Sequence, residues 1–208
     1  VRSYALTKGG PEFGGYRNRD PICSELVAFP NLEWLIIRDM PNWEEWSFFK
    51  DEVAAADGRG EDGAAEIRKE DAQSARLQLL PRLVGLHLED CPKLRALPRQ
   101  LGEVAASLKE LRLIGTNNLN ALEDFPLLSV LLIQNCTSLE LISNLPRVTD
   151  MCAHGCPNLS HVERLDSLQR LGLGEDMQEI SSRWVPGLQE QHQRLHGEDL
   201  DVSTWSSS

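Results

Sequence analysis

The stretch Leu83-Val-Gly-Leu86-His-Leu88-Glu-Asp-Cys91-Pro-Lys-Leu94-Arg-Ala-Leu97 contains the pattern on which the fold depends. Its apolar skeleton is L-x-x-L-x-L-x-x-C-x-x-L-x-x-L. The spacing is two residues from Leu86 to Leu88, which is typical of a strand, and three residues from Leu88 onward. Neither a single helix nor a long strand has this mixed period. The pattern predicts a short strand, a turn and a return segment along one edge of a core.

The same skeleton recurs along the chain. Further units begin at Leu32, Leu108, Leu128, Val148 and Leu168. The last four starts are separated by three consecutive steps of 20 residues, a regularity that chance would not maintain. Thr116 departs from the pattern, and Trp43 and Trp46 fill two apolar positions of the first unit, where we expect core packing rather than ligand stacking. Repeats of this length and signature are leucine-rich repeats.

The repeat pattern becomes irregular toward the C-terminus. The last regular unit holds the pattern for half its length and then slips by one residue, to Met177 and Ile180. Leu188 begins a degenerate unit whose strand positions would be the polar Gln191 and Gln193. We therefore expect the apolar core to end there.

Composition divides the chain into segments. Residues 1–28, rich in Gly, Pro and charge, predict an irregular lead-in from an upstream repeat, and residues 29–196 form the predicted repeat domain. An acidic insertion at about 49–78 interrupts the array, and it has too few apolar residues to offset its ordering entropy, so we expect disorder there. A partner-binding tether or a protease-sensitive spacer stays open as its role. Residues 197–208 form an acidic, Ser-rich tail.

The overall charge favours some partners over others. The 208-residue chain carries a net charge of -11 and has a pI of about 4.9. An acidic surface repels phosphate backbones, so we expect no nucleic-acid partner. No apolar run approaches the length of a membrane span, so we expect none.

The repeat pattern predicts an α/β leucine-rich-repeat solenoid, or horseshoe, with short parallel strands on the concave face and a mostly irregular convex side. Successive strand residues point to opposite sides of a sheet, so the leucines face the core and the residues between and just after them face outward. Equivalent residues of stacked strands lie about 4.8 Å apart and form columns. The candidate partner-binding residues on this concave face are Trp34, Ile36, Arg38, His87, Glu89, Glu110, Arg112, Val130, Leu132, Gln134, Asp150, His154 and Arg170.

These columns mix charged, amide, apolar and aromatic groups, as a protein-recognition surface does. Ile36, Ile114, Val130 and Leu132 are apolar at positions that are usually polar, which favours a partner. Scattered apolar surface residues without a function are the alternative.

Three cysteines share one repeat position. Cys91, Cys136 and Cys156 are each expected to be a small buried side chain that closes the turn after a strand. Cys152, His154 and Cys156 alternate, so a metal site is the alternative, but the repeat frame turns Cys156 toward the core and C-x₂-C pairs are absent from the sequence. Five cysteines is an odd number and packing explains three of them, so we expect no disulfide.

Sequence signatures of catalysis are lacking. The motifs G-x-x-x-x-G-K-[ST], G-x-S-x-G and H-E-x-x-H do not occur in the sequence, so we expect neither enzymatic activity nor a cofactor in this chain. Two N-x-[ST] triplets, at Asn135 and Asn158, keep open the alternative of a secreted or cell-surface ectodomain. A metal-binding or enzymatic domain is the other alternative.

Four stretches carry a family resemblance. They are Phe29-Pro-Asn-Leu32-Glu-Trp-Leu35, Met40-Pro-Asn-Trp43-Glu-Glu-Trp46, Leu94-Arg-Ala-Leu97-Pro98 and the segment from Leu188 to Trp205. Together they resemble the C-terminal repeat region of the coiled-coil nucleotide-binding leucine-rich-repeat disease resistance proteins of grasses. The resemblance covers about residues 25–205, and its more specific parts are the Trp-x-x-Trp unit and the C-terminal segment. The Gly-x-Ile-Pro motif typical of extracellular plant repeats is lacking.

The resemblance implies a function in plant defence. In that family the repeats restrain a nucleotide-binding switch and perceive a pathogen effector, directly or through a guarded host protein. It implies that the partners are such a protein and the receptor's own nucleotide-binding domain. It also implies that ADP or ATP binds upstream of this segment, and that the receptor is cytoplasmic or nucleo-cytoplasmic.

Overall fold

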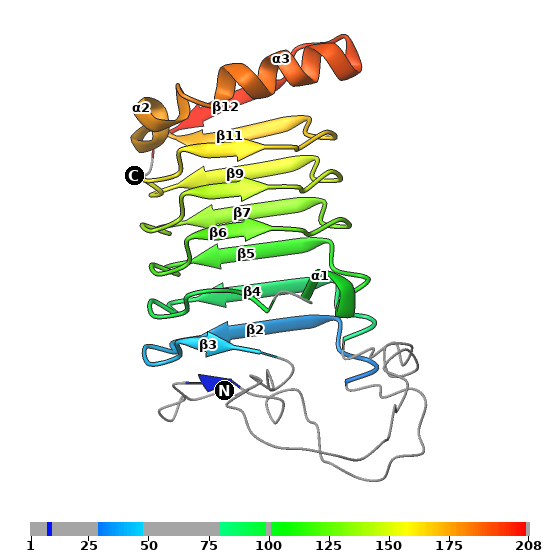
Figure 1. Ribbon diagram of the computed structural model, residues 1–208, viewed down its shortest axis with the longest axis vertical. Coiled ribbons are helices and arrows are strands. Elements are labelled where there is room, and N and C mark those ends of the chain that lie inside the picture. The colour runs from blue at the N-terminus through cyan, green and yellow to red at the C-terminus, as the bar shows by residue number, and fades with distance from the viewer. Residues whose placement is uncertain (1–7, 10–28, 48–79, 99–100, 207–208) are drawn as a thin grey trace, which may run out of the picture.

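The computed structural model describes residues 8–9, 29–47, 80–98 and 101–206 (Figure 1). It is a mixed α/β structure with more strands than helices, and within these residues the strands form open parallel sheets rather than a closed barrel. The expected insertion at about 49–78 and nearly all of the lead-in at 1–28 lie outside the described residues.

The main sheet has seven parallel strands in the order β12-β11-β9-β7-β5-β4-β2, stacked along the length of the molecule (Figure 1). The strands are β2 (Trp34–Arg38), β4 (Gly85–Glu89), β5 (Glu110–Ile114), β7 (Val130–Gln134), β9 (Asp150–His154), β11 (Arg170–Gly174) and β12 (Asp201–Trp205). Equivalent residues are in register, so Leu86 pairs with Leu111, which pairs with Leu131. A shift of one residue would turn every leucine to solvent, which fixes this register. The predicted parallel strands are confirmed.

Short strands also line the return segments. β6 (Ala121–Glu123), β8 (Leu141–Ser143) and β10 (His161–Glu163) form a three-stranded parallel sheet, and β1 (Lys8–Gly9) pairs in parallel with β3 (Glu45–Trp46). This side is more regular than the sequence predicts. The reason is that 20-residue units bring equivalent short segments side by side in register, so their backbones can form a ladder.

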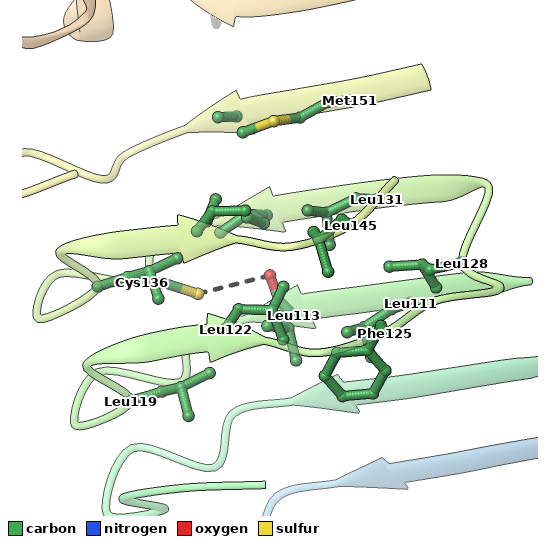
Figure 2. Packing of buried hydrophobic residues seen from close by; sticks show 14 of the residues in the cluster. Leu111, Leu113, Leu119, Leu122, Phe125, Leu128, Leu131, Cys136, Leu145 and Met151 are labelled. Carbon is green, nitrogen blue, oxygen red and sulfur yellow. Dashed lines mark hydrogen bonds between the residues drawn. The ribbon is translucent and has the colours of Figure 1, made fainter. Parts of the chain in front are cut away.

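The apolar repeat positions form one core (Figure 2). Leu111, Leu131 and Leu171 are 0%, 1% and 0% exposed, as the repeat frame predicts. Trp43 and Trp46 are also buried, with ring centroids 5.2 Å apart, which agrees with core filling. Full burial of one large apolar side chain is worth about 1.5–3 kcal/mol, so these positions account for much of the stability.

The sequence frame missed one further core position. Buried side chains occur three residues before the first leucine of most units, at Leu80, Ala105, Phe125, Leu145 and Leu165. Each carbonyl there accepts the N–H of that first residue, as between Leu80 and Leu83 over 3.1 Å. These residues recur at constant spacing in the sequence, but they range in size from Ala105 to Phe125, so the repeat position is hard to recognise.

The turns after β2, β4, β5, β7 and β9 each use a left-handed residue. These residues are Asp39, Asp90, Gly115, Asn135 and Gly155, with φ between 53° and 67°. Gly, Asn and Asp adopt this conformation more readily than other residues. All but Gly155 donate their backbone N–H to the last carbonyl of the next main strand, as from Asn135 to His154 over 2.9 Å. This ladder holds consecutive turns in register.

The following turn residue is buried in each unit. Its occupants are Met40, Cys91, Thr116, Cys136 and Cys156. The Cys136 thiol donates to the carbonyl of Leu113 over 3.6 Å (Figure 2) and lies 3.0 Å from the Thr116 hydroxyl. Thr116 therefore fits among the cysteines because its hydroxyl has a buried partner. The structural interpretation of the three turn cysteines is confirmed.

The C-terminal end differs from the sequence expectation. The remaining elements are α1 (Leu101–Val104), the 3₁₀ turn η2 (Glu175–Met177), α2 (Gln178–Ser181) and α3 (Val185–His196). Gln191 and Gln193, expected at strand positions of a degenerate unit, lie in α3 instead. The segment assigned to the tail supplies β12, which extends the main sheet beside β11, with Leu200 buried before it. The expected end of the core at the degenerate unit was therefore wrong.

Helix α3 packs against β10, the last strand of the three-stranded sheet. The Trp184 indole N–H, just before α3, donates to the carbonyl of Leu159 over 2.8 Å in a buried position. Gln191 Nε2 donates to Asp166 Oδ1 over 2.6 Å. A helix suits this place because polar residues on its other side can face water. None of the helices within the described ranges has the length and apolarity of a membrane span.

Candidate functional site

The outward face of the main sheet, the side that points away from the core, carries all the candidate residues. The register arranges them in three columns. The first is Trp34, Gly85, Glu110, Val130, Asp150 and Arg170; the second is Ile36, His87, Arg112, Leu132, Cys152 and Gly172; the third is Arg38, Glu89, Ile114, Gln134, His154 and Gly174. The candidates therefore form one continuous surface, called here the outward strand face.

A connected polar cluster lies on β4 and β5. Glu110 Oε1 accepts from Arg112 Nε over 2.6 Å and lies 3.2 Å from His87 Nε2. The Trp34 ring meets the His87 ring edge-on, with centroids 5.3 Å apart. Arg112 is exposed, whereas His87 and Glu110 are half-buried. One carboxylate thus orients two neighbouring donors and leaves the outer side of Arg112 open to a partner.

Two further ion pairs cross between neighbouring strands. Arg38 pairs with Glu89 at 2.5 Å, and Arg170 pairs with Asp150. The hydrogen bond from Arg170 holds the pKa of the Asp150 carboxyl below its ordinary value. Exposed ion pairs contribute little to stability, so these pairs chiefly set the pattern of charge on the face.

His154, in the third column of the outward strand face, contacts Asp176 in the turn η2. Its Nδ1 lies 2.6 Å from Asp176 Oδ1, and Asp176 Oδ2 accepts the N–H of Gly155 over 2.7 Å. A side chain at Gly174 would overlap His154 and Asp176. Glycine at that strand position therefore permits this contact.

Apolar groups interrupt the charged ones. Trp34 and Ile36 are each 46% exposed, and Val130 is 37% exposed. Leu132 is half-buried beside Arg112 in the second column. The apolar contribution is thus concentrated at β2 and at the central strand β7.

Two tryptophans lie over glycines, an arrangement that the repeat pattern did not reveal. A Cβ at Gly85 would overlap the Trp34 ring, and a Cβ at Gly172 would lie 2.5 Å from the Trp205 ring. Gly85 and Gly172 are consequently buried although they stand in outward columns. The signal in the sequence was a glycine at an outward strand position near an end of the array.

Burial or a raised pKa keeps the cysteines near the face from acting as activated nucleophiles. A hydrogen bond with Cys156 lowers the pKa of the Cys136 thiol to about 7, but Cys136 is 0% exposed. Burial raises the pKa of the Cys91 thiol to about 11. Burial and the nearby Asp150 carboxylate also raise the pKa of the half-buried Cys152. For Cys156, a hydrogen bond with Cys136 and burial both raise the pKa. Among the described residues, no three His, Cys, Asp or Glu side chains converge as metal ligands.

A groove lies at the carboxyl edge of the sheet, beside the first three units. This carboxyl-edge groove has a volume of about 430 Å³ and is lined by Asp39, Pro41, Asp90, Pro92, Gly115 and Asn117. The Asp90 carboxylate leans across Gly115, where a Cβ would lie 2.8 Å from Oδ1. Within the described residues no cation pairs with Asp39 or Asp90, and the buried Asn117 Oδ1 has no donor. Sequence reasoning missed the groove because its residues come from turns that differ from unit to unit.

Comparison of the chain with protein-family models, with curated proteins and with solved structures finds no match. Conclusions about function therefore depend on the outward strand face, the groove and the sequence resemblance.

Proposed function

We propose that this chain is the leucine-rich-repeat recognition module of an intracellular plant immune receptor. Under this proposal the repeats form a solenoid whose concave side is the outward strand face. That face binds a pathogen effector or a guarded host protein and also contacts the receptor's own nucleotide-binding domain. The receptor acts in the cytoplasm, or in both cytoplasm and nucleus, and ADP or ATP binds outside this segment.

The observation that carries the proposal is the chemistry of the outward strand face. Its arginines are engaged in ion pairs with Glu89, Glu110 and Asp150, so its charge is largely balanced internally. Its exposed apolar groups, chiefly Ile36 and Val130, have no such compensation. Binding energy at protein interfaces usually concentrates in a few aromatic, Arg and apolar anchors, and this face offers all three.

The repeat architecture supports the solenoid part of the proposal. Units of 20 residues place their strands in register on both sides of one core. Each unit then contacts mainly its neighbours, which is how repeat proteins build extended binding surfaces. The resemblance to grass disease resistance proteins adds the plant immune context.

An ectodomain of a secreted or cell-surface receptor is the second candidate. Both sequon asparagines are exposed, although Asn158 Nδ2 already donates to the carbonyl of Thr137 over 2.8 Å. Asn135 uses its backbone N–H in the turn ladder. Glycans on Asn135 or Asn158 in protein from the native host would favour this candidate over the intracellular receptor.

A comparative pull-down tests the proposal. The full-length parent protein is used as bait in wild-type form and with Arg112→Glu plus Leu132→Lys, two changes at the middle of the outward strand face. We expect the wild type to retain a protein that the variant loses. A matched control carries Arg147→Glu and Leu141→Lys, the same chemical changes at an exposed and a half-buried position away from this face. Equal loss in both variants, or in neither, would contradict the proposal.

A further inference from the structure

We propose that the carboxyl-edge groove and the neighbouring Trp34 and Ile36 form the docking site for a basic, apolar protein segment. The segment places a Lys or Arg side chain between Asp39 and Asp90 and an apolar side chain on Ile36. This inference rests on the proposed function, because it names the partner chemistry of one end of the outward strand face.

The groove offers hydrogen-bond acceptors without matching donors. Asp39 and Asp90 project from equivalent turns of consecutive units, and neither has a cationic partner among the described residues. A guanidinium or ammonium group supplies several donors and a positive charge, which complements these two exposed carboxylates.

The apolar part of the site lies on β2, just before the turn that carries Asp39. Trp34 and Ile36 are the most exposed large apolar side chains on the outward strand face, at 46% each. The Arg38–Glu89 ion pair stands between Ile36 and the groove, and its charges are already balanced. A partner segment that runs along β2 toward the groove therefore meets first the apolar Ile36, then the Arg38–Glu89 ion pair, and then the anionic groove.

These positions set the spacing of the partner's anchors. Ile36 and Asp39 are three residues apart, a span of ~10 Å in extended chain. An extended partner strand that crosses both positions thus separates its apolar and basic anchors by about three residues. Lysine or arginine at that distance from an aromatic or aliphatic residue is the expected motif.

Random peptides displayed on phage provide the probe. They are selected against the whole chain, and the enriched peptides are then synthesised and their affinities measured by fluorescence polarisation. We expect enrichment of peptides that carry a basic residue and an apolar residue. We also expect binding to weaken as salt is raised, because exposed charges are screened.

Two amide substitutions test the groove. Asp39→Asn with Asp90→Asn removes both charges while keeping residues that tolerate the left-handed turn, and Asn135 already occupies the equivalent position of a later unit. We expect the double variant to bind the selected peptide about tenfold more weakly or worse, since it loses charge-assisted contacts. Ile36→Gln should also weaken binding.

A carboxylate elsewhere gives the matched control. Asp124 has a φ of 64° in a different turn, and Asn144 occupies its equivalent position with a φ of 55°. Asp124→Asn therefore makes the same chemical change in the same conformation, outside the groove. It should leave peptide affinity unchanged, and melting curves should show that every variant folds.

Several outcomes would overturn the inference. These are enrichment of peptides without basic residues, equal affinity for the groove variant and the Asp124→Asn control, or uptake of calcium alone that the groove variant loses. Binding that depends on Arg112 and Leu132 but not on Asp39 and Asp90 would remove this inference and leave the proposed function standing. Selected peptides that respond to neither pair of substitutions would count against both.

Discussion

The N–H of Gly155 donates to the carboxylate of Asp176, whereas the equivalent N–H of each earlier unit donates to a strand carbonyl. Asp176 thus completes the turn ladder at its last step. We expect Asp176→Ala to lower the free energy of unfolding by about 0.5–1.5 kcal/mol, because it removes the carboxylate acceptor of this exposed hydrogen bond and water replaces it only in part. Urea denaturation measures the loss. Glu179→Ala, an exposed acid nearby, is the control, and equal effects of the two changes would refute the capping role.

A second prediction concerns the core. Leu131→Ala should cost about 2–5 kcal/mol, because Leu131 is 1% exposed and its truncation leaves a cavity between units. The adjacent Val130 points outward, so Val130→Thr, which keeps the branched side chain, should cost much less. Denaturant midpoints compare the two variants. A loss below about 0.5 kcal/mol for Leu131→Ala would be incompatible with the repeat frame.

A third prediction concerns cysteine reactivity. At pH 8 a thiol with a pKa of about 11, such as Cys91, is ~0.1% thiolate, and it is fully buried as well. Cys152 is half-buried at the outward strand face. We expect iodoacetamide to modify Cys152 before Cys91, Cys136 or Cys156 in the native chain, as peptide mass spectrometry can follow. In urea the four should react at similar rates. Early modification of Cys91 in the native state would be inconsistent with the packed turns.

A fourth prediction concerns pH. Arg170 holds the pKa of Asp150 below the ordinary 3.8, so the folded state prefers the ionised carboxyl. The resulting stability is present above the ordinary pKa and is lost as the pH falls through the lowered one. Wild type should exceed Asp150→Asn in stability by less than about 1 kcal/mol at neutral pH, since the pair is exposed. Melting temperatures between pH 7 and pH 3 should converge toward the acid end. A gap that widens with acidification would contradict this assignment.

Periodicity predicted the part of the molecule that repeats. It placed the buried leucines, the turn cysteines and the three outward columns, because spacing alone determines which strand residues face the core. It did not predict β12 or α3, because the end of an array depends on long-range contacts such as that between Trp184 and Leu159. It also missed the contact of Trp34 with Gly85, which depends on side-chain direction rather than on spacing.

The carboxyl-edge groove shows a similar limit. Asp39 and Asp90 could be aligned as equivalent turn residues from the sequence. Their meeting with Asn117 in one hollow depends on the turn geometry of three units and on Gly115 leaving room for the Asp90 side chain. Such a site becomes visible only when the turns are stacked in space.

The most direct test of the central claim is partner-triggered signalling by the full-length receptor carrying Arg112→Glu and Leu132→Lys. Both side chains lie next to each other in one column of the outward strand face, so the double change should abolish the response while the melting temperature stays close to that of the wild type. Signalling is measured with and without the partner, because release of a restrained switch would instead give constitutive output. Loss of the partner response, or constitutive output, is the result expected of a face that binds a partner or the switch. Wild-type signalling in both conditions, together with wild-type stability, would contradict the claim that this face performs recognition.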